Sequence, residues 1–344
     1  MPQCYLFPML SKKKLMTNET CNLRHTRRDA FLKSLGLESA TLEAMQADAS
    51  FRRYYRVHGA GKPMLLMEDP PDRQVELSPV KVEEFIAIGG HLRNMGLHAP
   101  EVYHRNVAHG LLLIEDFGDD TYTRLFAQGK DPKALYTLAI DALIALHNHP
   151  RCSAIDLGNH NADVLVEGAM LLLDWYYPAL TGKQPTVAMK ESFADVWRGL
   201  FQKFPSDQKA LVLRDYHVDN LMLVPGEGVW ACGLLDFQDA LIGQCSYDVM
   251  SLLEDARRDV AEDLREFLYG HYLKGRQGAI DAQAFQHAFR ILAAQRHARV
   301  LGVFVRLSVR DGKDRYLQFI PHVHKQMEEH TSEIQSLTNL VCRL

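Results

Sequence analysis

Short strand-like segments with turn residues between them occupy the first part of the chain. They are residues 42–45, 52–57, 64–67, 102–103 and 111–115. A helix is predicted over residues 28–35, and a second where apolar residues recur at helical spacing from Val82 to Leu92, with a start signal at Ser78–Pro79 and a stop at Gly96. The pattern predicts a small sheet that carries one helix after its third strand.

The rest of the chain has mostly helical spacing. An apolar stripe from Leu135 to Leu146 ends before Pro150, and further helices are predicted over residues 162–177, 190–204, 247–270 and 284–308. A polar stretch, residues 213–220, interrupts them and leads into a predicted hairpin with strands at 221–224 and 229–235. This order predicts an α+β fold with a small N-terminal β-rich lobe and a large C-terminal helical lobe.

Three oxygen-bearing side chains stand in a fixed order around that hairpin. Asp215 comes five residues before Asn220, and Asp236 follows the second strand. Phosphoryl transfer needs a base for the acceptor hydroxyl and hard oxygen ligands for Mg²⁺, and this set can supply both. Taken alone, each residue is better explained structurally, Asp215 and Asn220 as loop caps and Asp236 as the end of a strand. The three together favour a phosphotransfer site, because the hairpin returns Asp236 to Asn220.

Composition and charge narrow the class of protein. The 344 residues are 47% apolar and 24% charged, with a net charge of −4 that gives no indication of nucleic-acid binding. The six cysteines show no C-x-x-C pair, which favours reduced thiols in the cytoplasm. No apolar run is long enough for a membrane span. No protein partner can be inferred, and residues 1–20 are expected to be poorly ordered.

The chain resembles the aminoglycoside phosphotransferase and choline kinase branch of the kinase-like superfamily, through residues 143–147, the stretch from Asp215 to Asn220, and Asp236. It is most similar to the bacterial anomeric N-acetylmuramate/N-acetylglucosamine kinases of cell-wall recycling. That similarity rests on residues 48–54, 112–120, 235–240, 251–260 and 310–313. The resemblance implies a protein-kinase-like fold with an extension at 1–26, an N-lobe at 27–116 and a C-lobe at 117–344.

The same resemblance assigns roles to single residues. It implies that Asp215 is the catalytic base, and that Asn220 and Asp236 are the Mg²⁺ ligands. Backbone groups of the hinge would hold the adenine of ATP, and a turn between the first two strands would cover its phosphates. The hinge residues are Glu115, Asp116 and Phe117; the turn residues are Ser50, Phe51, Arg52 and Arg53.

One feature departs from most kinase-like enzymes, which place a lysine on the third strand to bind the α- and β-phosphates. Residues 64–69 contain no lysine. We hypothesise that Arg52 or Arg53 supplies this charge. On the acceptor side, Asp239 is predicted either to contact a sugar hydroxyl or to cap a turn, and His217 either to contact the acceptor or to support the catalytic loop.

The predicted activity is ATP-dependent phosphorylation of an amino sugar, at the anomeric hydroxyl of N-acetylmuramate or N-acetylglucosamine, in peptidoglycan recycling. Two alternatives stay open: an aminoglycoside antibiotic phosphotransferase, and a nucleotide-binding regulator without turnover. Charge separates the first alternative from the prediction, because cationic aminoglycosides call for an acidic acceptor site and the lactyl carboxylate of N-acetylmuramate for a basic one.

Overall fold

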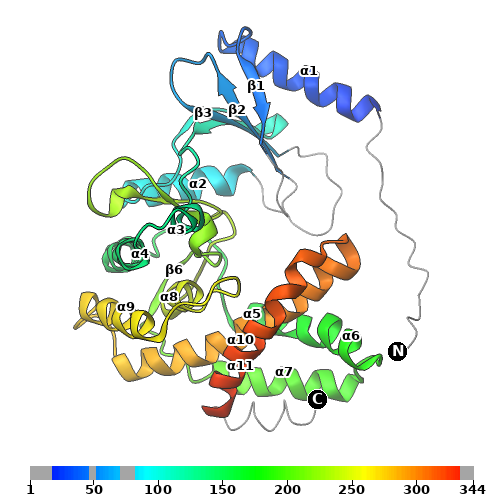
Figure 1. The fold of residues 1–344 in the computed structure, drawn as a ribbon, viewed down its shortest axis with the longest axis vertical. Helices are drawn as coiled ribbons and strands as arrows, with labels where there is room; N and C mark the ends of the chain where they lie inside the picture. The colour runs from blue at the N-terminus through cyan, green and yellow to red at the C-terminus, as the bar shows by residue number, and fades with distance from the viewer. Residues whose placement is uncertain (1–17, 46–51, 70–81, 334–344) are drawn as a thin grey trace. The chain divides into compact units, whose positions relative to one another are not determined.

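The computed structural model describes residues 18–45, 52–69 and 82–333, except for the side chains of 18–22 and 331–333. The chain folds into two compact units (Figure 1). The first consists of Met1–Leu77 and Val102–Asp116, and the second of Ser78–Glu101 and Phe117–Leu344. Each unit is therefore assembled from two separate stretches of sequence.

The first unit holds an antiparallel five-stranded sheet in the order β1-β2-β3-β5-β4. The strands are β1 Thr41–Ala44, β2 Arg53–His58, β3 Met64–Glu68, β4 Val102–Asn106 and β5 Leu111–Glu115. Phe31 and Leu32 of α1 (Asn18–Ser34) share a buried apolar cluster with Leu66 and Leu113 of the sheet. The five predicted strands are confirmed, and the first helix begins at Asn18 rather than at residue 28.

The helix that follows β3, α2 (Val82–Asn94), belongs to the second unit although it lies within the stretch predicted as the N-lobe. Its Phe85 ring stacks on Phe237 with 5.0 Å between the ring centroids. Just beyond the helix, the carbonyl of His98 accepts a 2.8 Å hydrogen bond from the N–H of Leu234. These contacts connect the helix and the segment after it to residues on either side of Asp236.

Helices make up most of the second unit. Those that follow α2 are α3 Tyr122–Ala127, α4 Pro132–Asn148, α5 Ala162–Leu171, α6 Tyr177–Thr181, α7 Val187–Phe201, α8 Ser246–Leu253, α9 Glu262–Gly275, α10 Ala282–Asp311 and α11 Ile320–Glu333. Together with the sheet of the first unit, they confirm the α+β class. Among the described helices, none combines the length and apolar character that a bilayer span requires.

One predicted helix is wrong. Residues 247–270 form two helices, α8 and α9, separated by a non-helical segment from Glu254 to Ala261. Side chains compete with helical hydrogen bonds there. The Asp255 carboxylate accepts the backbone N–H of Arg257 at 3.0 Å, and the Glu254 carboxylate contacts His330 of α11 at 2.7 Å. Helical periodicity in the sequence does not reveal either interaction.

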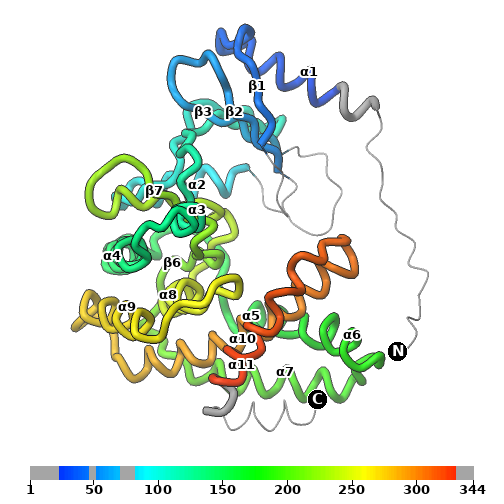
Figure 2. Tube along the Cα trace, in the orientation of Figure 1, coloured from blue at the N-terminus to red at the C-terminus, as the bar shows by residue number. Residues whose placement is uncertain are grey.

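The long helix α10 runs beside α5 and α11 through the centre of the second unit (Figure 2). Its approach to the end of α5 depends on Gly302. A Cβ at this position would lie 2.2 Å from the carbonyl oxygen of Leu171, which is backbone and has no room to move away. Glycine therefore allows two helix backbones to come into direct contact here.

Two short strand pairs frame the polar stretch. β6 (Lys209–Val212) pairs with β9 (Leu241–Gln244), and β7 (Leu221–Leu223) pairs with β8 (Cys232–Leu234). The hairpin is confirmed, but the first part of its predicted second strand is a 3₁₀ turn, Gly228–Ala231. The indole of Trp230 in this turn stacks on His98 at 4.2 Å. Packing of this ring explains why the segment leaves the strand.

Candidate active site

Asp215 lies in the loop between β6 and β7. Hydrogen bonds to a buried side chain hold the backbone of this loop. Arg214, the residue before it, has a φ of 70°, a left-handed conformation that is unfavourable for a side chain of this kind. The carboxylate of Asp248 accepts the N–H groups of Leu213 at 2.6 Å and of Arg214 at 2.9 Å. Two hydrogen bonds to one buried carboxyl group, whose pKa burial raises to about 7, thus hold the loop that presents Asp215.

Sequence analysis missed Asp248. It is fully buried in α8, within the otherwise apolar and small sequence around Val249 and Met250. An aspartate at a core position of a helix requires a hydrogen-bonding partner. Its position among apolar residues in the sequence could therefore have indicated a structural role. The partner itself lies 34 residues earlier in the chain, at Arg214, and could not be read from spacing.

Opposing effects act on the pKa of Asp215. Burial raises it, whereas the positive charges of nearby arginines lower it; Arg299 has the largest effect, followed by Arg296 and Arg214. The net result is a pKa below the ordinary value, so Asp215 is ionised at neutral pH. An ionised carboxylate can accept the proton of a hydroxyl as a general base.

Asn220 and Asp236 come together as the hairpin predicted. The Asn220 side-chain nitrogen donates to the Asp215 carbonyl at 2.9 Å and lies 3.4 Å from a carboxylate oxygen of Asp236. The N–H of Leu235 also donates to the carbonyl of Asn220 at 3.0 Å. The structure therefore places all three residues of the predicted base and metal set in one network.

The orientation of these groups fits a magnesium ion. Because the nitrogen of the Asn220 amide faces protein acceptors, its oxygen is the atom left for a cation. Asp236 has a φ of 57°, and its other carboxylate oxygen accepts a 2.7 Å hydrogen bond from Gln238. One amide oxygen and one carboxylate are ligands of the kind that Mg²⁺ takes together with water and phosphate oxygens. Gln238, which sequence analysis did not single out, orients this carboxylate.

His217 and Asp239 flank the network. Burial, followed by the charge of Arg257, lowers the pKa of His217, and its Nε2 lies 3.3 Å from the Asn220 side-chain nitrogen. This buried, neutral ring supports the loop. The Asp239 carbonyl accepts from Arg214 at 3.2 Å, and its carboxylate contributes to raising the pKa of Arg299.

The predicted nucleotide residues lie in the first unit and at its border. Ser50 and Phe51 are outside the described residues. Arg52 is buried and forms a 3.1 Å ion pair with Asp69. Arg53 is the first residue of β2, and its Cα is opposite Glu68 in the register with β3. Arg52 is therefore already paired within its unit.

The predicted hinge begins at Glu115, which is the last residue of β5. The carboxylate of Asp116 forms a 2.7 Å ion pair with Arg56 of β2. Phe117 begins the second unit, where its ring meets the edge of His98 at a centroid distance of 4.7 Å. With the Asp116 side chain occupied, backbone groups are what this segment can offer to a base.

Sequence comparisons match the chain to one family of enzymes. The profile of the phosphotransferase enzyme family matches residues 41–300. The N-acetylmuramate/N-acetylglucosamine kinase of Caulobacter vibrioides is 32% identical over 329 residues, which cover 87% of this chain and 90% of that protein. The kinase of the same name from Pseudomonas putida is 31% identical over 315 residues, 89% of each chain.

Solved structures of low sequence identity share the fold. An ADP-bound aminoglycoside phosphotransferase superposes with a TM-score of 0.57 at 15% identity, covering 90% of this chain and 98% of its own. A GDP complex of an aminoglycoside 2'-phosphotransferase reaches 0.60 at 14% identity, with the same coverage. The ethanolamine kinase of Plasmodium vivax reaches 0.57 at 11% identity, with coverage of 93% and 91%. These similarities confirm the predicted kinase-like architecture.

Proposed function

This chain belongs to the phosphotransferase enzyme family, and we propose that it transfers the γ-phosphoryl group of ATP to a hydroxyl of an amino sugar. One observation carries the proposal: Asn220 joins the Asp215 loop to Asp236 through contacts of 2.9 and 3.4 Å. A nucleotide-binding regulator without turnover has no need for a base and two metal ligands held in one network.

The proposed chemistry begins at Asp215. Its ionised carboxylate accepts the proton of the acceptor hydroxyl as the oxygen attacks the γ-phosphorus. The bond from this phosphorus to the bridging oxygen breaks, ADP leaves, and Asp248 keeps the loop in place during the step. Asn220 and Asp236 would hold Mg²⁺, which, when bound, neutralises charge on the phosphate oxygens. Gln238 fixes one oxygen of Asp236, so that the carboxylate need not reorient when the nucleotide arrives.

For the nucleotide, we propose that backbone groups of Glu115, Asp116 and Phe117 bind adenine. The turn that includes Ser50 and Phe51 would cover the phosphates. Arg52 and Arg53 are both candidates for the missing lysine charge, and the guanidinium of Arg52 also forms an ion pair with Asp69. ATP as the donor implies that the reaction takes place in the cytoplasm.

The acceptor is proposed from the names of the relatives. Two proteins that match nearly the whole chain at 31–32% identity are N-acetylmuramate/N-acetylglucosamine kinases. We therefore propose the anomeric hydroxyl of one of these sugars as the acceptor, as part of peptidoglycan recycling. The positive charge around Asp215, from Arg299, Arg296 and Arg214, suits an anionic or neutral sugar better than a cationic aminoglycoside.

One assay tests the proposal. ATP consumption is measured with N-acetylmuramate, N-acetylglucosamine and kanamycin, for the wild type, Asp215→Asn and the exposed control Asp207→Asn. We expect turnover with the amino sugars, a loss of at least about a hundred-fold in Asp215→Asn, and no loss in the control. Turnover with kanamycin alone would refute the acceptor, and full activity in Asp215→Asn would refute the base.

A further inference from the structure

A cavity of about 230 Å³ lies inside the second unit, next to the catalytic loop. Its walls come from α5, from α10 and from the segment that carries Arg214. Three guanidinium groups line it, those of Arg214, Arg299 and Arg306. Arg299 and Arg306 are seven residues apart on α10, about two helical turns, so both side chains leave the same face of the helix.

The cavity is cationic. Glu167 is its one acidic lining residue, against three arginines. His160, which also lines it, has its pKa lowered to about 3 by burial and then by the charges of Arg214 and Arg299. This histidine is therefore neutral at physiological pH. A site with more fixed positive than negative charge is complementary to an anionic ligand.

Within the described part of the chain, Arg306 has a buried donor without an acceptor, a feature that it shares with Arg214. Its Nε is buried and, among the described residues, has no hydrogen-bond partner. Burial lowers its pKa, and so do its neighbours Arg310 and Arg299; Asp311, the nearby acid that acts against them, is paired with Arg310 at 2.8 Å. A buried guanidinium donor without an acceptor is costly, which points to a ligand that supplies one.

The other two arginines connect the cavity to the site of chemistry. Arg299 is the largest charge that lowers the pKa of Asp215, and Asp215 and Asp239 both help to raise the pKa of Arg299. Arg214 precedes Asp215 in the chain and donates to the Asp239 carbonyl at 3.2 Å. Through Arg214 and Arg299, the lining of the cavity is therefore connected to the loop that presents the base.

Gly168 of α5 makes space for this arrangement. A Cβ at this position would lie 3.2 Å from Cδ of Arg299 and 3.0 Å from the side-chain nitrogen of Gln295. Gln295 itself donates to the Leu165 carbonyl at 2.7 Å. The Arg299 side chain thus lies against a helix surface that lacks a side chain, with a fixed neighbour beside it.

We propose that this cavity binds the carboxylate of the acceptor, the lactyl group that distinguishes N-acetylmuramate from N-acetylglucosamine. This inference rests on the proposed function, since it assigns a substituent of the proposed substrate. Guanidinium groups bind carboxylates through paired, charge-assisted hydrogen bonds, and Arg306 has an unused donor to contribute. Arg306 is then a specificity-determining residue that acts on one of the two sugars.

A comparison of the two sugars tests the assignment, because N-acetylglucosamine has the same ring and acetamide but no carboxylate. We measure KM for both sugars and for ATP in the wild type, Arg306→Gln and Arg306→Lys. The control is Arg198→Gln on α7, where the arginine is exposed and paired with Asp195. Thermal melting of each variant checks that it is folded.

In Arg306→Gln, we expect the KM for N-acetylmuramate to rise by about ten-fold or more relative to that for N-acetylglucosamine, with Arg306→Lys in between. Arg198→Gln should resemble the wild type. Equal changes for both sugars, no change for either, or a rise confined to the KM for ATP would each overturn the inference while leaving the proposed function intact. A wild type that phosphorylates neither sugar would refute both.

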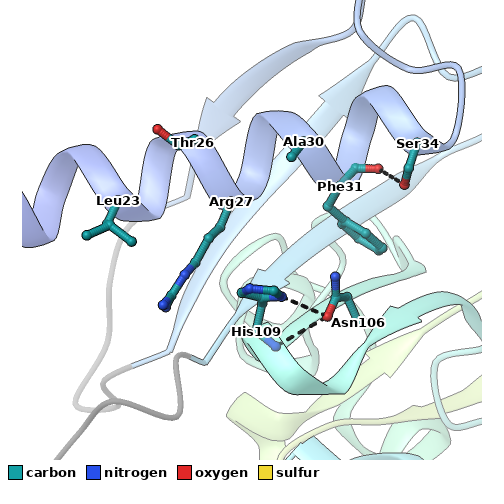
Figure 3. A pocket seen from close by; sticks show the side chains of 8 residues that line it. All are labelled: Leu23, Thr26, Arg27, Ala30, Phe31, Ser34, Asn106 and His109. Carbon is teal, nitrogen blue, oxygen red and sulfur yellow. Dashed lines mark hydrogen bonds between the residues drawn. The ribbon is translucent and has the colours of Figure 1, made fainter.

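A second hollow, of about 800 Å³, is found in the first unit between α1 and the β4–β5 connection (Figure 3). Phe31, Asn106 and His109 are among its lining residues, and the Asn106 side chain accepts from the backbone of His109. It contains none of the predicted site residues, and nothing in its lining indicates a ligand.

Discussion

The buried carboxylate of Asp248 holds the backbone N–H of Arg214 at 2.9 Å, immediately before the proposed catalytic base. A second hydrogen bond, to the N–H of Leu213 at 2.6 Å, makes the contact bidentate. Arg214 has a φ of 70°, which is unfavourable for a residue with a side chain. The two hydrogen bonds to Asp248 stabilise the loop in this conformation. Asp248 is thus a positioning residue, which acts on catalysis through the loop.

The first prediction concerns Asp248→Asn. The amide cannot accept both N–H groups as well as the carboxylate does, so we expect a lower free energy of unfolding, by roughly 1–3 kcal/mol, and a kcat that falls at least ten-fold. Urea denaturation and steady-state kinetics measure the two effects. A purely structural role predicts an unchanged kcat for the protein that remains folded, and this result would contradict the positioning role.

Much of this architecture could be predicted from local patterns. The five strands of the sheet and the hairpin that brings Asp236 to Asn220 depend on turn residues and on runs of apolar residues, which are properties of neighbouring positions. A loop and a two-stranded hairpin leave few ways to arrange Asp215, Asn220 and Asp236. Their spacing was therefore enough to predict a phosphotransfer site.

What was missed depends on contacts between distant residues. The break between α8 and α9 reflects side chains that bind backbone and a residue of α11, neither of which alters helical periodicity. Arg299 and Arg306 lie on a helix that was predicted, but their convergence with Arg214 is a tertiary property. The same holds for Trp230, whose packing on His98 replaces the start of a predicted strand with a 3₁₀ turn.

A second prediction tests the metal ligands. In Asp236→Asn, we expect kcat to fall by roughly two to four orders of magnitude and the Mg²⁺ concentration for half-maximal activity to rise, because a neutral amide is a weaker ligand for a hard cation. Glu227→Gln, an exposed change in the turn of the same hairpin, is the matched control. An Asp236→Asn enzyme with an unaltered magnesium titration would exclude this carboxylate from the metal site.

The third prediction is a pH dependence. Arg299 lowers the pKa of Asp215, so this base stays ionised further into the acid range than an ordinary carboxyl group does. Burial raises the pKa of Asp248 to about 7, and this effect is common to the wild type and Arg299→Gln. In Arg299→Gln the pKa of Asp215 rises, which protonates the base at a higher pH and moves the acid limb of kcat/KM upwards. N-acetylglucosamine is the substrate here, since it lacks the carboxylate assigned to the cavity.

At about pH 5, the Arg299→Gln enzyme should retain a smaller fraction of its own activity at about pH 8 than the wild type does. Arg310→Gln, with its exposed arginine on the same helix, controls for the loss of a positive charge. Identical acid limbs in the wild type and Arg299→Gln would show that this guanidinium does not set the protonation of the base.

The fourth prediction addresses the missing strand lysine. We expect Arg53→Ala to raise the KM for ATP strongly, by about ten-fold, with a smaller effect on the KM for the sugar. Arg52→Ala removes the ion pair with Asp69 and should also lower stability. Arg105→Ala, an exposed change on β4 of the same sheet, serves as the control. Normal ATP affinity in both Arg52→Ala and Arg53→Ala would refute the hypothesis that either arginine replaces the lysine.

The last prediction separates two glycines that lie in helices of the same unit. In Gly302→Ala, the new Cβ would lie 2.2 Å from the Leu171 carbonyl oxygen, so α10 and α5 must move apart, and we expect a loss of roughly 1–3 kcal/mol in the free energy of unfolding. In Gly199→Ala, no atom lies within 4 Å of the new Cβ, and helix propensity should stabilise the protein by up to about 1 kcal/mol.

Denaturation of both variants measures the difference in their free energies of unfolding. Steady-state kinetics show whether the change also affects substrate binding. Gly302 lies between Arg299 and Arg306 on α10, so its replacement should also disturb the cationic cavity and raise the KM for N-acetylmuramate more than that for N-acetylglucosamine. Gly199→Ala should leave both KM values unchanged. If Gly302→Ala is as stable as Gly199→Ala, the two helix backbones do not make the contact described here, and the position of Arg306 opposite α5 is not fixed by it.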